Sequence, residues 1–443
     1  MGLKVCKFGG SSLADAKAMK QVAEIIRSDS ARKYVVVSAP GKRFADDIKI
    51  TDSLYACARA VAEKGTCAKE FEKIADRYIG IVNELALDLD IESLLKQTRE
   101  SIDASGGDAD FSASRGEFLN AIIVSKLLGY DFIDAEELIK FDDDGKFNAE
   151  YTNDVTSARL KKHQRAVIPG FYGSRPGDVI KTFSRGGSDI TGAIVARAVN
   201  ADVYENWTDV DGFCAADPRI VKNPAKIDVI SYKELRELSY MGASVLHAEA
   251  IFPVSIAGIP INIRNTFAPE GSGTLIVPNS DHTKNGKLIT GIAGRKGYVV
   301  ITVEKSMMNE ELGFTRRVLS VLERYGVSFE HVPTGIDTLS LVISASELSG
   351  RLEKIIQRIR EAVDPDSITI DGELALVATV GHGMSFKKGT AGRLFNALSK
   401  ADINIRMIDQ GSSEMNIIVG VIPEDYEKTI LAIYDEFIGN QNA

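Results

Sequence analysis

The sequence predicts an α/β protein that consists of one large α/β domain followed by two smaller βαββα modules. Three observations indicate this architecture. The chain has 443 residues, which is longer than a single typical core supports. Segments with the periodicity of strands and of helices alternate up to about residue 290. After that point, a pattern of apolar residues and glycines occurs twice, with an offset of 76 residues.

The chain opens with a βαβ unit. Residues 3–8 form a short strand that ends at a Gly-Gly-Ser-Ser turn, and a helix with one apolar face follows. Residues 34–37 are almost wholly apolar, which is typical of a strand buried on both faces of a parallel sheet. The next helix is expected to be capped by Thr51 and Asp52 and to end at Lys64.

The rest of the large domain alternates in the same way. Residues 68–103 have helical patterns, and residues 110–117 lead into a strongly apolar helix that starts at Phe118. Further strands are expected at residues 132–133, 166–168, 201–206 and 260–264.

Residues 185–189 read Arg-Gly-Gly-Ser-Asp and precede an apolar pattern with helical spacing. Ser188 and Asp189 are expected to cap this helix, because Ser and Asp are preferred N-cap residues. The two glycines leave backbone N–H groups uncovered, and a helix N-terminus beside the fixed cation Arg185 favours anions. This stretch therefore predicts the floor of a phosphate-transfer site.

Lys7 lies at the end of the first strand, directly before the Gly-Gly-Ser-Ser turn. A lysine at a strand end often extends its ammonium group into water. The adjacent glycines and serines favour a functional interpretation instead, because they form a second backbone nest for phosphate oxygens. A lysine above such a nest is typical of a polyphosphate site.

The other candidate residues each have a plain structural interpretation as well. Arg185 fits a solvated loop cation, Glu117 fits a first-turn helix acid, and Asp189 fits a simple cap. The polar residues of the next loop also fit ordinary turns: Thr208, Asp209, Asp211 and Asp217.

Composition and charge exclude several classes of function. A net charge of −9 argues against nucleic acid as the main partner. No apolar run approaches the roughly 20 residues that span a bilayer, and the first residues lack a charged-then-apolar leader. The four cysteines have no C-x-x-C spacing, and His247 has no second histidine or cysteine nearby. We therefore expect a cytoplasmic protein with no membrane partner and no metal site built from protein ligands alone.

Known nucleotide motifs are absent from the sequence. There is no G-x-x-x-x-G-K-[ST] sequence, no H-R-D with D-F-G pair, and no G-x-G-x-x-G after the first strand. The chain is therefore neither a P-loop enzyme nor a protein kinase.

The C-terminal repeat aligns without a gap. Gly313 matches Gly389, and apolar positions on both sides match at the same offset. Each copy reads strand, glycine loop, amphipathic helix, strand, strand, helix, which predicts two modules stacked as a pair.

Six motifs in order, together with this repeat, resemble one family. The motifs are Lys7–Ser12 (KFGGSS), Phe183–Asp189 (FSRGGSD), Trp207–Gly212 (WTDVDG), Ala216–Arg219 (ADPR), Glu237–Ala243 (ELSYMGA) and Asn265–Thr274. They resemble the aspartate kinases of the amino acid kinase superfamily, which carry two C-terminal ACT modules. The resemblance covers nearly the whole chain, and the order of the motifs makes it specific.

The resemblance implies the domain organisation. It implies an αβα-sandwich amino acid kinase domain at residues 1–290, followed by ferredoxin-like ACT modules at residues 297–365 and 371–443. It also implies a homodimer or homotetramer formed through the ACT modules.

The activity that the resemblance implies is transfer of the γ-phosphoryl group of ATP to the β-carboxylate of L-aspartate, with Mg²⁺. The product is 4-phospho-L-aspartate, the first step towards lysine, threonine and methionine. This chemistry needs no general base, because a carboxylate with a pKa near 4 is already ionised at neutral pH. Cations and backbone donors are needed instead, to offset repulsion between two anionic reactants.

The resemblance also assigns roles by position. The catalytic set is Lys7, Arg185 and Asp189. Lys7 stabilises the transferring phosphoryl group, Arg185 clamps the α-carboxylate, and Glu117 with Asp189 receives the α-amino group. Aspartate contacts are expected from Ser38, Thr51, Glu117, Arg185, Gly186, Gly187 and Ser188. ATP contacts are expected from Lys7, Gly9, Gly10, Ser11, Thr208, Asp209, Asp217 and Arg219.

Three positions depart from the family pattern. Ser244 stands where many relatives have Lys, Ala248 where they have Pro, and Cys214 where some have Tyr. A supplementary nucleotide contact is therefore lost or supplied elsewhere.

The ACT pair implies feedback control by an amino acid, lysine and/or threonine. The candidate effector residues are Met308, Gly313, Phe314, Ser328, Glu330 and Thr334. Three alternatives stay open. The modules could only dimerise, the enzyme could act on another amino acid or a nucleotide, or the kinase domain could have decayed into a sensor. The paired repeat disfavours the second, and the intact Lys7, Glu117, Arg185 and Asp189 disfavour the third.

Overall fold

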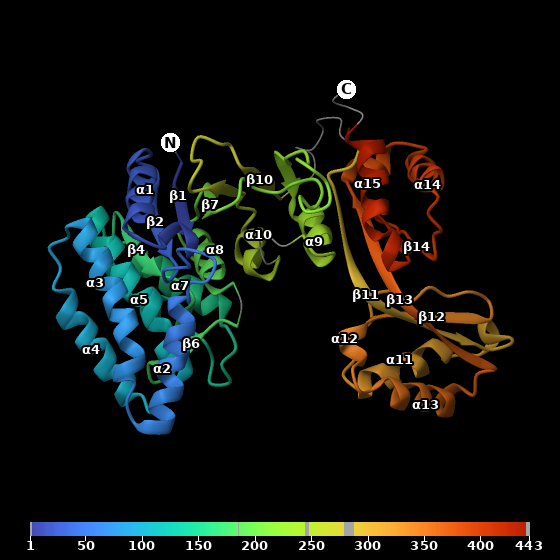
Figure 1. Cartoon of the computed structure of the whole chain (residues 1–443), viewed down its shortest axis with the longest axis horizontal. Helices are drawn as coiled ribbons and strands as arrows, with labels where there is room; N and C mark the ends of the chain where they lie inside the picture. The colour runs from blue at the N-terminus through green and yellow to red at the C-terminus, as the bar shows by residue number, and fades with distance from the viewer. Residues whose placement is uncertain (1, 185, 244–247, 279–287, 440–443) are drawn as a thin grey trace. The chain divides into compact units, whose positions relative to one another are not determined.

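A computed structural model describes residues 2–184, 186–243, 248–278 and 288–439 (Figure 1). The chain divides into two compact units. The first unit comprises Met1–Phe213, Lys226–Tyr232 and Ser244–His282, and the second comprises Cys214–Ala225, Lys233–Ala243 and Thr283–Ala443. Three residues named above lie outside the described residues: Arg185, Ser244 and His247.

An eight-stranded sheet with the order β3-β4-β2-β1-β7-β9-β10-β8 forms the centre of the first unit. Neighbouring strands are parallel except β9 and β10, which are antiparallel. The strands are β1 (Lys4–Phe8), β2 (Arg32–Val37), β3 (Asp131–Phe132), β4 (Ala166–Pro169), β7 (Val203–Thr208), β8 (Val229–Ser231), β9 (Ile261–Asn265) and β10 (Thr274–Val277). A separate hairpin contains β5 (Tyr172–Arg175) and β6 (Val179–Thr182).

All the strands expected in this unit are present, with ends shifted by one or two residues. The short strands β5, β6, β8 and β10 were not expected, because four-residue segments carry little periodic signal.

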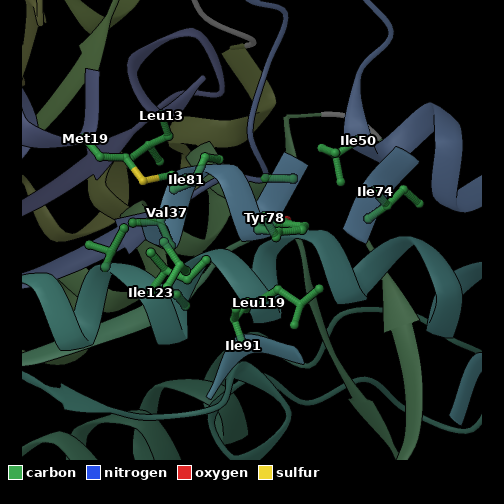
Figure 2. Close-up of a cluster of buried hydrophobic side chains, with 14 of the residues drawn as sticks. Leu13, Met19, Val37, Ile50, Ile74, Tyr78, Ile81, Ile91, Leu119 and Ile123 are labelled. Atoms are coloured by element: carbon green, nitrogen blue, oxygen red, sulfur yellow. The ribbon is translucent and has the colours of Figure 1, made fainter. Parts of the chain in front are cut away.

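Helices cover the sheet. Those of the first unit are η1 (Ser11–Leu13), α1 (Ala16–Arg27), α2 (Ile50–Lys64), α3 (Ala68–Leu85), α4 (Ile91–Ala104), α5 (Ala109–Leu128), α6 (Ala135–Leu138), α7 (Ala149–Leu160), α8 (Gly187–Ala198), η2 (Ala248–Ile251) and α10 (Phe252–Ala257). Figure 2 shows part of the main core, where Met19 of α1, Tyr78 of α3 and Leu119 of α5 surround Val37 of β2.

Side-chain alternation assigns the two faces of the sheet. Phe8 of β1 and Trp207 of β7 stack on each other in the core that α1 to α5 cover. The residues before them, Lys7 and Asn206, are register partners on adjacent strands. Since successive side chains of a strand point to opposite faces, Lys7 and Asn206 lie on the other face, where α8 packs.

A buried acid links three strands in the core. Glu205 of β7 contacts Arg32 of β2 at 2.8 Å and Lys4 of β1 at 3.2 Å, and it accepts the indole N–H of Trp207 at 3.0 Å. Arg32 and Lys4 outweigh burial and lower the pKa of Glu205. Removing one partner of such a buried pair typically costs about 3–5 kcal/mol, so the network fixes the register of these strands.

Two helix starts differ from the sequence prediction. Lys49 is the N-cap of α2 and makes no side-chain cap bond, so Thr51 and Asp52 lie inside the first turn. The apolar helix begins at Ala109 instead of Phe118, because the Asp108 side chain accepts the N–H of Phe111 and caps it there. Glu117 is therefore a mid-helix residue, and its interpretation as a first-turn acid was wrong.

The second unit contains a five-stranded antiparallel sheet with the order β12-β11-β13-β15-β14. Its strands are β11 (Gly291–Glu304), β12 (Thr338–Ser344), β13 (Ser367–Val380), β14 (Met407–Asp409) and β15 (Asn416–Val421). Its helices are η4 (Met308–Glu310), α11 (Phe314–Arg324), α12 (Ala345–Leu348), α13 (Leu352–Val363), η5 (His382–Phe386), α14 (Thr390–Lys400), η6 (Pro423–Asp425) and α15 (Tyr426–Phe437). Helix α9 (Tyr232–Tyr240) joins this unit from Lys233 onwards.

The 76-residue offset is visible in this unit. Helices α11 and α14 occupy matching positions, and both are preceded by a glycine with positive φ, 77° at Gly313 and 86° at Gly389. The copies differ at the strand expected after the helix. The second copy has β14, whereas the first has only isolated bridges from His331 and Thr334 to β12. Pro333 lies between these bridges and has no N–H to donate to a ladder.

The two modules exchange strands. β11 and β13 are each 14 residues long and pair along almost their whole lengths. Residues 291–295 of β11 add a strand beside residues 376–380 of β13, and residues 367–371 of β13 add one beside residues 300–304 of β11. Each module therefore takes a strand from the chain segment that opens the other module, the third strand of the first module and the fourth of the second.

Candidate active site

Lys7 and Asp189 form the centre of the site. Lys7 is only 8% exposed, and its Nζ lies 2.6 Å from Oδ1 of Asp189 in the first turn of α8. The ammonium is therefore paired inside the protein, and the interpretation of Lys7 as a strand-end lysine that reaches water was wrong. This contact joins the end of β1 to the helix start that the Gly-Gly motif predicts.

A glycine and not a side chain begins helix α8. Gly186 is the N-cap, with φ of 58°, and no side chain caps the helix. Ser188 and Asp189 are consequently inside the first turn, so the expectation that they cap α8 was wrong. The Asp189 carboxylate binds Lys7 instead of the backbone, because β1 brings a buried cation next to it.

Gly187 is required by close packing. A Cβ at this position would lie 2.6 Å from the Phe171 ring and 2.8 Å from its Cα. The helix start is thus pressed against the loop after β4, which leaves no room for a side chain.

The Gly-Gly-Ser-Ser turn lies beside Lys7. The N–H of Gly9 donates to the carbonyl of Trp207 at 3.0 Å, so this donor is already used. Within the described chain, the N–H groups of Gly10 and Ser11 have no backbone acceptor. These two donors remain for the predicted anion nest, whereas the N–H of Gly9 does not.

The segment after β2 lies next to the same turn. Ser38 donates its N–H to Phe8 at 3.2 Å, and Gly41 donates to Gly10 at 2.8 Å. Parallel strands β1 and β2 therefore deliver the Gly-Gly turn and Ser38 to one edge of the sheet, as sites in open α/β sheets require.

Glu117 on α5 has a buried carboxyl group with few hydrogen-bond partners. It is 5% exposed, and in the described part of the chain its Oε2 atom has no hydrogen-bond partner. Burial raises the pKa of Glu117 to about 8, although the N–H of Ala39, which donates to it, partly opposes the shift. A neutral carboxyl with a free oxygen is ready to receive a cation, such as a substrate amino group.

Packing places Glu117 near the loop that contains Ser38. The Asn120 amide donates to the carbonyl of Ser38 at 2.6 Å, and Tyr78 donates its hydroxyl to Gly116 at 2.8 Å. A Cβ at Gly116 would lie 2.9 Å from Ala39, so α5 and this loop are in direct contact. The N-terminus of α2, with Thr51, packs against the same glycine through Ile50 and Leu54.

The expected nucleotide residues fall into two groups. Thr208 ends β7 and donates to Asp209 at 3.2 Å, at the same sheet edge as Lys7. Asp217 and Arg219 belong to the second unit, where the guanidinium binds its neighbour's carboxylate at 2.6 Å and lowers the pKa of Asp217.

Two polar residues on β7 were missed by the sequence interpretation. Asn206 donates its amide to Oδ1 of Asp189 at 2.9 Å, and Tyr204 donates its hydroxyl to the Asp189 carbonyl at 3.2 Å. One signal could have found Asn206. A polar residue in a strand expected to be buried on both faces requires a polar partner.

Comparisons with known proteins now decide the family. The model of the amino acid kinase family matches residues 2–265, and an ACT domain model matches residues 377–437. Aspartokinase 3 of Bacillus subtilis is 41% identical to this chain and aligns over 98% of each. The chain belongs to the aspartokinase family.

Solved aspartokinase structures have the same fold. The aspartate kinase of Clostridium acetobutylicum superposes with a TM-score of 0.94 at 54% identity, covering 98% of this chain and all of that one. Aspartokinase III of Escherichia coli, in complex with aspartate and ADP, gives a TM-score of 0.74 at 26% identity, covering 98% of this chain and 99% of that one. The predicted fold class, a kinase domain followed by ACT modules, is confirmed.

The ACT modules of this aspartokinase hold the expected effector residues in two settings. Met308 and Phe314 are buried in the core of the first module, and Gly313 is the N-cap of α11. Ser328 and Thr334 lie near the edge of β12 together with Glu330, whose carboxylate accepts the Tyr240 hydroxyl of α9. Burial and the Glu330 carboxylate raise the pKa of Tyr240 to about 12.

Membrane and metal expectations can be compared only with the described residues. No helix among them combines the length and the apolar character that crossing a bilayer requires. The same residues contain no cluster of three or more His, Cys, Asp or Glu side chains suited to a metal ion. Mg²⁺ at phosphoryl-transfer sites is held mainly by nucleotide phosphates and water, with one or two carboxylates from the protein.

Proposed function

We propose that this chain transfers the γ-phosphoryl group of ATP to the β-carboxylate of L-aspartate and forms 4-phospho-L-aspartate. The observation that carries the proposal is the buried Lys7–Asp189 ion pair at the start of α8. Membership of the aspartokinase family and the E. coli structure with aspartate and ADP support the choice of substrates. In metabolism the product would serve lysine, threonine and methionine biosynthesis.

The catalytic task is electrostatic. The attacking carboxylate is ionised at neutral pH, so the protein must offset repulsion between it and the phosphates. Lys7 supplies a buried positive charge, and the uncovered N–H groups of Gly10, Ser11 and the α8 start supply donors. Such preorganised groups act in a site with little water, where they are stronger than in solution.

Lys7 exchanges partners during the reaction. Without substrates its ammonium is neutralised by Asp189, and as the phosphoryl group moves it turns towards the developing negative charge. Asp189 holds the lysine in place beforehand. Mg²⁺ bound with ATP would be held mainly by the nucleotide phosphates and would neutralise further phosphate charge.

Aspartate is held by groups at the neighbouring sheet edge. Its α-amino group pairs with Glu117, which has a free oxygen and lies against the Ser38 loop. Ser38, Thr51, Gly186, Gly187 and Ser188 line the remainder, and Arg185 clamps the α-carboxylate. The nucleotide lies towards Gly9, Gly10, Ser11, Thr208 and Asp209. Asp217 and Arg219 keep the nucleotide role that the family pattern implies.

A hydroxamate assay tests the proposed function. The purified chain is incubated with ATP, Mg²⁺ and hydroxylamine, which traps an acyl phosphate. Colour is expected with L-aspartate and not with glutamate, acetylglutamate or a nucleoside monophosphate. Absence of an aspartate-dependent signal in correctly folded protein would refute the proposed activity.

Replacing Arg185 with alanine is expected to raise the KM for aspartate by 10-fold or more while kcat changes less. The reason is that a carboxylate clamp binds the substrate equally in the ground and transition states. Steady-state kinetics with varied aspartate measure the split. An unchanged KM contradicts the role.

We further propose that an amino acid, lysine or threonine, regulates the enzyme through the ACT modules. The E. coli relative is named lysine-sensitive aspartokinase 3, and a structure of E. coli aspartokinase III contains lysine. The same proposal includes three domain limits, 1–290, 297–365 and 371–443. It also includes a homodimer or homotetramer formed through the modules and a cytoplasmic location. The strand exchange between β11 and β13 supports regarding the two modules as one regulatory body.

The Tyr240–Glu330 hydrogen bond makes a prediction about regulation. An effector amine that takes Glu330 must displace the Tyr240 hydroxyl, so Tyr240→Phe is expected to lower the half-inhibitory concentration by about 3–10-fold. Glu330→Ala should abolish inhibition. Activity is titrated with lysine and threonine separately, with Tyr325→Phe as control. An unchanged inhibition curve in Tyr240→Phe and Glu330→Ala contradicts the role of Glu330. If neither lysine nor threonine inhibits the wild type, the modules have dimerisation as their role.

A further inference from the structure

We propose that Asn206 is a positioning residue for phosphoryl transfer, which holds the Asp189 carboxylate and, through it, the Lys7 ammonium. The inference rests on the proposed function of Lys7 and Asp189. It adds a residue that lies outside the motifs by which the site was found.

Three elements meet at one carboxylate oxygen. Oδ1 of Asp189 on α8 lies 2.6 Å from Lys7 Nζ of β1 and accepts the Asn206 amide of β7 at 2.9 Å. The amide nitrogen must face the carboxylate, because an ionised carboxylate only accepts hydrogen bonds. Asn206 is 3% exposed, so water does not compete for its amide.

The sheet register explains why Asn206 acts at this point. Lys7 and Asn206 are paired on adjacent parallel strands, so their side chains leave the same face of the sheet at the same height. Tyr204, two residues earlier on β7, faces the same way and donates to the Asp189 backbone carbonyl. Strand β7 thus contacts the first turn of α8 at two points. Tyr204 binds the backbone carbonyl of Asp189, and Asn206 binds the Asp189 carboxylate.

The two contacts have different consequences. Tyr204 fixes where the helix lies, whereas only Asn206 fixes the direction of the carboxylate. When Lys7 turns to the phosphoryl group, Asp189 loses one of its two donors. The Asn206 amide then remains as the donor that fixes the orientation of the carboxylate, and a lost hydrogen bond to a charged group is costly.

The test compares Asn206→Leu, which keeps the side-chain size, with Tyr204→Phe, which removes only the hydrogen bond to the same residue's backbone. We expect Asn206→Leu to lower kcat about 10–100-fold, with less than a threefold change in the KM for aspartate and a Tm close to that of Tyr204→Phe. We expect Tyr204→Phe to keep kcat within about threefold of the wild type.

Asn206→Asp provides a second measurement, the pH dependence of kcat, which would not change if Asn206 had only a structural role. The titratable groups that face position 206 are Lys7 on β1, Asp189 on α8 and Tyr204 on its own strand, and its partner on β9 is the apolar Ile263. Two adjacent carboxylates share a proton, and the protonated one can donate. The kcat of Asn206→Asp relative to the wild type is therefore expected to rise as the pH falls from 8 to 6.

The outcomes separate the inference from the function on which it rests. If the wild type forms no aspartyl hydroxamate, the proposed function fails. If the wild type is active and Asn206→Leu keeps wild-type kcat, or Tyr204→Phe loses as much as Asn206→Leu, the positioning role is overturned. A flat relative pH profile for Asn206→Asp overturns it as well, even if Asn206→Leu does not fold.

Discussion

Lys7→Ala is expected to lower kcat by about 10²–10³-fold, the scale for removing one preorganised electrostatic donor. The ammonium is buried and paired with Asp189, so it is positioned before the substrates arrive. Alanine removes the charge and leaves Asp189 with Asn206 as its donor. Since the contact to the transferring phosphoryl group strengthens in the transition state, kcat should fall more than the KM for ATP rises.

Lys4→Ala is the matched control for this prediction. Lys4 lies on the same strand and is also ion-paired, but with Asp29 and Glu205 at the other end of β1. Its removal should lower Tm and leave kcat nearly unchanged. Lys7→Met separates charge from volume. A correctly folded Lys7→Ala or Lys7→Met enzyme with near-normal kcat removes Lys7 from the mechanism.

Aspartate binding is expected to release a proton, because Glu117 changes its charge on binding. Burial holds the pKa of Glu117 at about 8 without substrate, so the carboxyl is protonated at pH 6–7. The α-ammonium of aspartate favours the carboxylate form, and the complex therefore binds fewer protons than the free enzyme. The KM for aspartate should fall as the pH rises towards about 8, by at most about tenfold per pH unit.

Glu117→Gln should raise the KM for aspartate by about 10–100-fold at pH 8 and flatten its pH dependence, because the amide cannot ionise. Glu136→Gln is the control, since burial also raises the pKa of Glu136 but this residue lies next to Asp134, outside the site. A KM for aspartate that keeps its pH dependence in Glu117→Gln contradicts the role.

The same carboxyl affects stability in a direction that can be measured. Its pKa is about 8 in the folded chain and has an ordinary value of 4.5, so the folded chain keeps a proton that the unfolded chain releases between these values. The free energy of unfolding should therefore decrease as the pH rises through this window. Without aspartate, Glu117→Gln should have a higher Tm than the wild type at pH 8.

Much of the fold could be predicted from the periodicity of apolar residues and from the turn residues that separate helices and strands. The apolar strand at residues 34–37 and the 76-residue offset predicted the parallel sheet and the paired modules, because both depend on local patterns that tertiary contacts then use. Strand β5 and strand β8 were not predicted, since four or fewer residues do not establish a period.

Pairing across the site was harder to predict. Lys7 and Asp189 were both singled out, but nothing local to either residue says that they meet. The meeting depends on β7 lying beside β1 and on Gly186 starting the helix, which leaves the Asp189 carboxylate free of a capping role. Asn206 was not predicted as a site residue, because its partner Asp189 is distant in the sequence. Glu117 was singled out as a first-turn acid, but the Asp108 cap starts the helix at Ala109 and leaves Glu117 buried in its middle.

The exchanged strands of the regulatory modules restrict what can be cut from this protein. A fragment that starts at residue 371 would lack the segment 291–295 that borders β13, and a fragment that ends at residue 365 would expose the flank of β11. Each piece would present an unsatisfied row of backbone donors and acceptors, which invites aggregation. Grafting effector sensitivity onto another enzyme therefore requires keeping residues 291 onwards together, with the segments Cys214–Ala225 and Lys233–Ala243 that belong to the same unit.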